Sequence, residues 1–328
     1  RMRAAAAQAE AGRSEALWLR RQTEAAVAAA VVRAYLDAGY ARQAADLSAR
    51  RATALAARLS ARERATLAGA VSRADVDADR QALSAAEAEL APLQGLAANA
   101  ARRLATLTGD PPGSVAVTAR PLASPDALPT GRPVDLLRRR PDVFVAEQRW
   151  AAAAAAARVA AAALYPQVSL GGQIGLAAAP GRLSEPGALT FGMGPSLTWS
   201  ILDQPRLRAR LAAADAGATA ALAQWDGVVL AALEEADSAI ETWVRASASA
   251  SSAAAALAAS ERRFAAATAR WNAGALSAAD LEGARLEHLQ SEIAATESAL
   301  RAAQAWTAAQ LALGAGWRDA VSGGRGDR

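Results

Sequence analysis

The chain has 328 residues, of which 53% are hydrophobic, 21% are charged and only 4% are aromatic. It contains no cysteine, which excludes disulfides, thiol nucleophiles and cysteine-based metal sites. All 36 basic residues are arginine, and the net charge of +4 is small, so the composition does not indicate a nucleic-acid-binding surface. Alanine, leucine, arginine and glutamate dominate, which favours long helices.

Residues 1–108 are predicted to form two long helices joined by a tip at residues 68–75. The first 68 residues contain no proline, and their apolar positions keep to helical spacing. Gly69 is expected to take a left-handed C-cap conformation and Asp75 to cap the second helix.

An extended connector is predicted at residues 109–133, which hold six prolines. A helix is expected at residues 134–163, with Pro141 near its first turn. The longest uncharged run, residues 159–181, is broken by Pro166 and two adjacent glycines, so it is not expected to be a membrane helix.

Residues 164–205 break the helical pattern and predict a β-hairpin. Apolar residues alternate with small or polar ones over about ten positions, twice, around a turn-rich segment at residues 179–187. We expect strands at residues 166–176 and 189–202. One face is apolar enough for lipid, a pattern typical of transmembrane β-barrel strands, although a half-buried hairpin of a soluble sheet has the same alternation.

The residues expected to face lipid are the apolar ones of both strands: Val168, Leu170, Ile174, Leu176, Phe191, Met193, Leu197, Trp199 and Ile201. Those expected to face the lumen are Gln173, Ser196 and Thr198.

The remainder of the chain, residues 206–317, is predicted to form two more long helices with a tip at residues 272–280. A polar, glycine-rich segment at residues 318–328 is expected to be a disordered tail.

The two pairs of long helices are copies of one unit. A shift of 205 positions, without any gap, lays Gly69 on Gly274 and Asp75 on Asp280. Glycine, aspartate and arginine in register over about a hundred residues indicate a tandem repeat. Because a helix and a hairpin precede the second copy, the chain is expected to lack an equivalent segment upstream of Arg1.

Helices of this length restrict the architecture. A helix of about 65 residues is nearly 100 Å long and needs partners along its whole length. A closed β-barrel needs about eight strands or more, so one hairpin requires strands from other subunits. An assembly of several chains is therefore expected.

Four stretches resemble those of one protein family. Residues 128–142 (LPTGRPVDLLRRRPD) resemble the segment that links the two repeats of TolC-like outer-membrane efflux ducts, in the OprM/NodT lipoprotein branch. Residues 163–166, 194–199 and 314–317 are similar to further motifs of that branch. The resemblance covers residues 1–317.

The resemblance implies a mainly α fold with a transmembrane β-hairpin. Three copies would share a twelve-stranded outer-membrane barrel, continuous with a periplasmic α-helical barrel. It implies the exit duct of a tripartite efflux pump, which docks a periplasmic adaptor and an inner-membrane RND-type transporter.

The resemblance also assigns roles to both tips. The adaptor would contact the tip residues Ala68, Gly69, Ala70, Val71, Ala273, Gly274, Ala275 and Leu276. Asp280 matches a residue that begins the narrow part of the tunnel, and three such carboxylates would form a cation-attracting gate. Asp280 as a helix cap is the alternative, and the second aspartate common in the family is Gly283 here.

Two further features depart from the family. Asp203-Gln204-Pro205 stands where the family usually has Asp-Gly-Gly, and the acylated N-terminal cysteine is absent together with the first segment.

Other functions are weighed on the same residues. His288, the only histidine, lies on a predicted helix, and no paired carboxylates, phosphate loop or nucleophile motif stands out, so neither an enzyme nor a cofactor site is expected. Arg138-Arg139-Arg140 lacks interleaved aromatics, so no nucleic acid is expected as a partner. A coiled-coil scaffold and a non-functional remnant of an efflux duct remain as alternatives.

Overall fold

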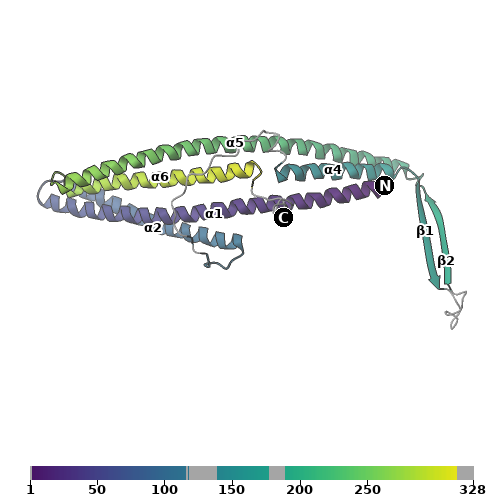
Figure 1. Cartoon of the computed structure of the whole chain (residues 1–328), viewed down its shortest axis with the longest axis horizontal. Helices are drawn as coiled ribbons and strands as arrows, with labels where there is room; N and C mark the ends of the chain where they lie inside the picture. The colour runs from purple at the N-terminus through teal and green to yellow at the C-terminus, as the bar shows by residue number, and fades with distance from the viewer. Residues whose placement is uncertain (1, 116, 118–138, 177–188, 316–328) are drawn as a thin grey trace, which may run out of the picture. The chain divides into compact units, whose positions relative to one another are not determined.

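The computed structural model describes residues 2–115, 117, 139–176 and 189–315. Within them the chain forms five α-helices and a two-stranded sheet (Figure 1). The elements are α1 Met2–Leu67, α2 Arg73–Thr108, α4 Pro141–Ala162, β1 Gln167–Leu176, β2 Leu189–Thr198, α5 Gln204–Asn272 and α6 Ala278–Ala312. The predicted connector from residue 118 onwards, the turn at 179–187 and the tail at 318–328 lie outside the described residues.

The predicted repeat is present in the backbone. Each copy is a long helix followed by one about half its length: 66 and 36 residues in the first, 69 and 35 in the second. Left-handed glycines occupy equivalent places in the two copies, Gly69 with Gly274 (φ +73° and +71°) and Gly109 with Gly314 (φ +82° and +78°). The same chain reversal and the same helix end were therefore kept in both.

Helix α4 is shorter than predicted. It begins at Pro141 and not at residue 134, because a residue that precedes proline is disfavoured in the helical conformation. Arg139 and Arg140 are non-helical, and residues 134–138 lie outside the described part of the chain.

The described helices belong to two compact units. The first combines residues 1–20 with residues 141–230, and the second combines residues 21–140 with residues 231–328. Helices α1 and α5 each contribute to both units.

Aromatic stacking holds the helices of the first unit together. Trp18 of α1 stacks on Phe144 of α4, with ring centroids 4.1 Å apart, and Trp150 of α4 lies 6.1 Å from Trp225 of α5. Arg149 Nε donates to Glu15 Oε1 at 2.7 Å. Helix α4 is thus fixed to the start of α1 and to the first part of α5.

Alanine forms most of the core of the second unit. Its three buried clusters centre on Ala38 with Leu104, Leu47 with Leu289, and Ala236 with Ala309. Alanine buries little area per residue, so many contacts along a long interface replace a thick core.

A series of polar bonds also joins α1 to α6 in this unit. Their order shows that the two helices run antiparallel: Gln304 to Asp37 (2.6 Å), Tyr40 to Glu297 (3.5 Å), Gln43 to Thr296 (3.3 Å) and Arg50 to Glu292 (3.3 Å). The first repeat is therefore bonded to the second over residues 37–50 of α1 and 292–304 of α6, and the two helices lie side by side in Figure 1.

Strands β1 and β2 pair antiparallel, with Gly171 opposite Gly194 at the centre. Val168 lies opposite Leu197 and Ile174 opposite Phe191, so the apolar residues of both strands share one face, as predicted.

The second strand ends earlier than predicted. It stops at Thr198, so Trp199 and Ile201 are not strand residues. The Trp199 indole and the Gln204 side-chain amide both donate to the carbonyl of Leu164, at 3.3 and 3.1 Å, and draw the chain out of the sheet. Pro205 then lies in the first turn of α5, where its missing N–H has no cost.

Helix α5 contains an 18-residue window long and apolar enough to cross a membrane, judged on length and composition among the described residues. At 1.5 Å per residue, however, the helix is about 100 Å long, roughly three times the thickness of the hydrocarbon core. Alanine accounts for much of that apolar character.

A buried arginine closes the second unit where α6 ends. Arg140 is 8% exposed, and it donates to the carbonyls of Ala312 (2.9 Å) and Ala232 (3.3 Å) and to the carboxylate of Glu235 (2.5 Å). The guanidinium thus satisfies a C-terminal carbonyl of α6 and binds it to α5. This contact explains the arginine directly before Pro141.

Gly314 packs closely against the backbone of Arg139 at this junction. A Cβ on Gly314 would lie 2.9 Å from the backbone of Arg139, whereas a Cβ on its repeat equivalent Gly109 would meet nothing within 4 Å. Gly109→Ala should therefore lose only about 1–2 kcal/mol, the cost of the left-handed conformation. Gly314→Ala should lose clearly more, measured as urea-induced loss of helical circular dichroism. Equal losses would show that the approach to Arg139 is not tight.

Candidate functional site

The two tips between the long helices have the same backbone structure. In each, a left-handed glycine follows the helix, and the next N–H returns to the last turn: Ala70 N to Ala65 O and Ala275 N to Arg270 O, both at 2.9 Å. These are helix C-caps of the Schellman type. The eight predicted adaptor-contact residues lie in these turns, and all are exposed or half-buried.

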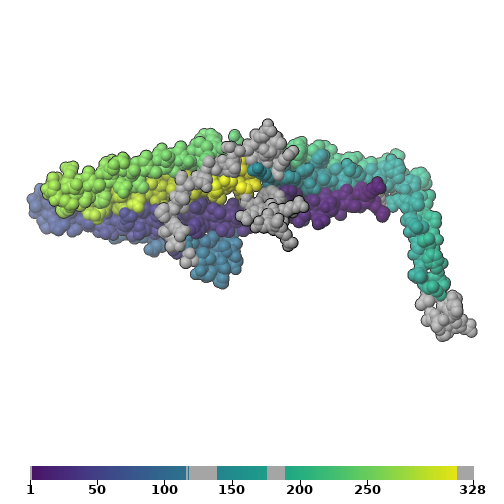
Figure 2. Space-filling model, viewed as in Figure 1, coloured from purple at the N-terminus to yellow at the C-terminus, as the bar shows by residue number. Residues whose placement is uncertain are grey.

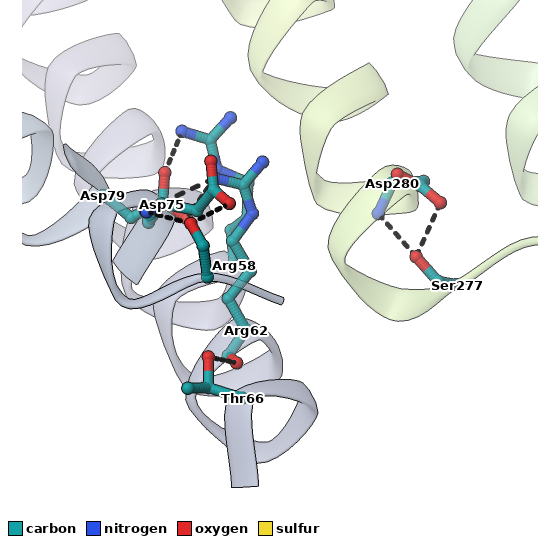
Figure 3. Close-up of polar contacts among 8 residues, drawn as sticks. Arg58, Arg62, Thr66, Asp75, Asp79, Ser277 and Asp280 are labelled. Atoms are coloured by element: carbon teal, nitrogen blue, oxygen red, sulfur yellow. Dashed lines mark hydrogen bonds and ion pairs between the residues drawn. The ribbon is translucent and has the colours of Figure 1, made fainter. Parts of the chain in front are cut away.

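Serine caps the helix after each tip, and the prediction that Asp75 would be the cap was wrong. The N-caps are Ser72 and Ser277, and each aspartate lies three residues later (Figure 3). Each serine Oγ accepts the aspartate N–H, at 3.2 and 3.1 Å, and donates to the aspartate carboxylate at 2.6 Å. With serine as the N-cap, each helix begins directly after the serine, at Arg73 and Ala278, and so before the aspartate.

The Ser72 hydrogen bonds hold the pKa of the Asp75 carboxyl below its ordinary value, with Arg62 adding a smaller effect. A lowered pKa stabilises the tip at pH values above the carboxyl's unfolded pKa, and this stabilisation is lost as the pH falls through the folded pKa.

Asp280 is exposed at the second tip, and its carboxylate accepts the Ser277 hydroxyl (Figure 3). Ser277 and not Asp280 is the N-cap, and the predicted gate is compatible with this, because the Asp280 carboxylate has acceptor sites beyond its hydrogen bond to Ser277. A ring of three carboxylates requires three copies of the chain, so the gate stays a prediction.

The first tip contains a buried ion cluster that sequence reasoning missed. Asp79 of α2 is 1% exposed, Arg58 Nη2 donates to its Oδ1 at 2.5 Å, and Arg62 Nη1 lies 3.3 Å from its Oδ2 (Figure 3). Arg62 lies near the end of α1 and Asp79 near the start of α2, a relation visible in the sequence once α1 and α2 are taken as a hairpin.

Leu67, the last residue of α1, was also missed. Its side chain is 90% exposed beside the first tip, unlike a helix-terminal leucine packed into a core. Its repeat equivalent is Asn272.

His288 lies at the contact of α5 with α6, one of the usual settings for a lone histidine. Its ring is parallel to Phe264 with centroids 5.7 Å apart, and its Nδ1 is 3.3 Å from Ser260 Oγ. The Ser260 hydroxyl also donates to the carbonyl of Leu257 at 2.8 Å. Among the described residues, no group of three or more His, Asp or Glu side chains is placed to hold a metal ion.

The hairpin leaves its apolar face uncovered. Val168, Leu170, Ile174, Phe191 and Leu197 are each about 70% exposed, and no helix covers them in the part of the chain that the structure describes (Figure 2). On the opposite face, the hydroxyls of Ser169 and Ser196 are 2.8 Å apart. An apolar face of this extent marks an interaction surface.

Comparison with known proteins gives consistent matches. The family described as outer membrane efflux protein matches residues 133–315. Nodulation protein T of Rhizobium leguminosarum bv. trifolii is 29% identical over 267 residues, which are 78% of this chain and 56% of that protein. The chain therefore spans little more than half the length of this relative.

Solved structures of channels match most of the chain. The outer-membrane channel OprN superposes with a TM-score of 0.82 at 31% identity, over 95% of this chain and 71% of that one. The open state of the MtrE outer membrane channel of Neisseria gonorrhoeae gives a TM-score of 0.81 at 25% identity, over 96% of this chain and 72% of that one.

Proposed function

This chain belongs to the outer membrane efflux protein family, and we propose that it forms the exit duct of a tripartite efflux pump. Members of this family are outer-membrane proteins, and their long helices extend into the periplasm. The duct would be a passive, gated conduit through which small molecules leave the cell. The observation that carries this proposal is the exposed apolar face of a hairpin joined in sequence to helices about 100 Å long.

The hairpin has the dimensions of membrane strands. Each strand has 10 residues, within the range of about 9–11 that a tilted strand needs to cross a bilayer. Each pairs only with the other among the described strands, so each has one unpaired edge. In lipid such edges must be paired, which supports a barrel closed by strands of other copies, in a trimer.

The partners follow from the same proposal. The exposed tips would dock a periplasmic adaptor, which connects the duct to an inner-membrane RND-type transporter. A coiled-coil scaffold, the alternative, has no use for an exposed apolar hairpin.

The test is efflux in a Gram-negative host whose own outer-membrane duct has been deleted. The wild-type chain should restore resistance to the pump's substrates, and Val71→Glu with Leu276→Glu should abolish it, because charge at both tips opposes docking. Neither substitution alters the glycine on which the turn depends. Outer-membrane trimer is quantified in parallel. If the wild-type chain forms a normal amount of trimer but restores no efflux, it is a non-functional remnant of a duct. If efflux survives Val71→Glu with Leu276→Glu, the tips have no docking role.

The lipid-facing assignment is tested at matched depth. Met193 and Gln173 lie next to the centre of the hairpin on opposite faces, with Gly172 opposite Met193 and Gly192 opposite Gln173. Met193→Arg should cost about 2–4 kcal/mol near the bilayer midplane, and Gln173→Arg should be tolerated in a wet lumen. Leu197→Arg, one residue from the strand end, should cost less than Met193→Arg. Trimer yield in the outer membrane measures all three, and a Gln173→Arg variant as impaired as Met193→Arg would count against the assignment of the faces.

The gate is proposed at Asp280, where three carboxylates would narrow the tunnel and attract cations. Asp280→Asn keeps an oxygen that can accept the Ser277 hydroxyl but removes the charge, so it should raise conductance and lower cation selectivity in planar bilayers. Asp75→Asn, at the equivalent place in the first repeat, is the matched control and should change neither. Asp280→Asn channels that conduct like the wild type would leave Asp280 only its hydrogen bonds with the Ser277 cap.

A further inference from the structure

The two tips share their backbone geometry but differ in one side-chain cluster. The first tip contains a buried carboxylate between two arginines of α1. At the repeat-equivalent positions of the second tip only one of the three charged residues is kept: Arg58, Arg62 and Asp79 correspond to Arg263, Ala267 and Ala284. The Arg58–Asp79–Arg62 cluster, named here the clamp, therefore belongs to the α1–α2 tip alone.

The clamp joins two helices at their ends. Arg58 and Arg62 are one turn apart on α1, and both reach the carboxylate of Asp79 on α2 (Figure 3). The side chain of Asp79 is only 2% exposed, whereas the arginine side chains are 21% and 29% exposed. Arg62 Nη1 also lies 3.5 Å from the carbonyl of Asp75, one turn earlier on α2.

Burial gives the clamp its effect. A carboxylate held away from water cannot lose its arginine partners without leaving an uncompensated charge, so separating α1 from α2 here is costly. Exposed ion pairs such as Arg80 with Glu63, also between these helices, contribute little because water and salt screen them.

The clamp lies directly before the exposed end of α1. The Thr66 hydroxyl donates to the carbonyl of Arg62 at 3.0 Å, and Leu67 follows with its side chain 90% exposed. A fixed backbone lowers the entropic cost of binding at this place, because less of the chain has to be ordered when a partner contacts Leu67.

We propose that the clamp holds the α1–α2 tip in one conformation before a partner arrives, so that this tip is the preorganised docking surface. The partner that docks there is the periplasmic adaptor of the proposed pump, with Leu67 as its apolar contact. The docking part rests on the function proposed above, whereas the rigidity of the tip does not. Arg58, Arg62 and Asp79 are positioning residues and touch no substrate.

The first test is amide hydrogen exchange on the full-length trimer. Arg62→Ala with Asp79→Ala gives the first tip the same residues as the second at these positions, a combination that an intact tip already accommodates. Exchange at residues 66–72 should rise about ten- to a hundredfold, because charge-assisted hydrogen bonds are lost. Arg80→Ala, which breaks only exposed pairs, should leave exchange there unchanged.

The converse variant grafts the clamp onto the second tip. Ala267→Arg with Ala284→Asp supplies the two missing members beside Arg263 and should slow exchange at residues 271–277. Unchanged exchange at residues 66–72 in the double alanine variant would overturn the clamp, whatever the duct does in a cell.

The docking part is tested with the adaptor of the strain in which the wild-type chain restores efflux. The double alanine variant should bind this adaptor at least about tenfold more weakly, at an equal amount of trimer and an unchanged single-channel conductance. Leu67→Ala should weaken binding similarly without altering exchange at the tip. Full affinity in both variants would overturn the docking role. If the wild-type chain itself restores no efflux, the duct assignment fails, and the exchange results still decide on the clamp.

Discussion

Within the described strands, the two-stranded hairpin leaves backbone N–H and C=O groups unpaired at both of its edges. Ten-residue strands with one apolar face suit a bilayer, where water is absent and every N–H and C=O needs a partner. Neither strand can satisfy its second edge within the described hairpin. A hairpin in lipid therefore needs further strands at both edges, which is why we propose a closed barrel to which several copies contribute.

The long helices obey a related constraint. Their cores are mostly alanine, so each contact contributes little and stability has to accumulate over length. Specific pairings are added where register matters, by the α1–α6 bonds in one unit and by aromatic stacks in the other. Arg140 closes the second unit by donating to the carbonyl of Ala312, at the end of α6. Small side chains with sparse polar bonds permit close helix packing while fixing how the helices align.

Duplication explains why two tips look alike and need not behave alike. The backbone rules that shape a tip are local: a left-handed glycine, a serine cap and an aspartate three residues later. Both copies retain these rules. The residues one or two turns further along the helices were free to diverge, and the buried carboxylate of the first tip has alanine as its counterpart in the second. The two repeats thus share the backbone geometry of the tip, but only the first has the buried ion cluster.

Patterns with a short physical range were predictable from the sequence alone. The hairpin and the face shared by its apolar residues followed from period-two alternation, and the repeat followed from glycine and aspartate in register. The family followed from motifs such as the run that ends in Arg-Arg-Pro-Asp. Other features depended on how separate segments meet in space. The early end of β2 depends on two side chains that bond to Leu164, and the buried state of Asp79 depends on the rotation of α2 against α1. Periodicity gives the apolar face of one helix but not its rotation against a neighbouring helix, so these contacts depend on how the segments pack in space.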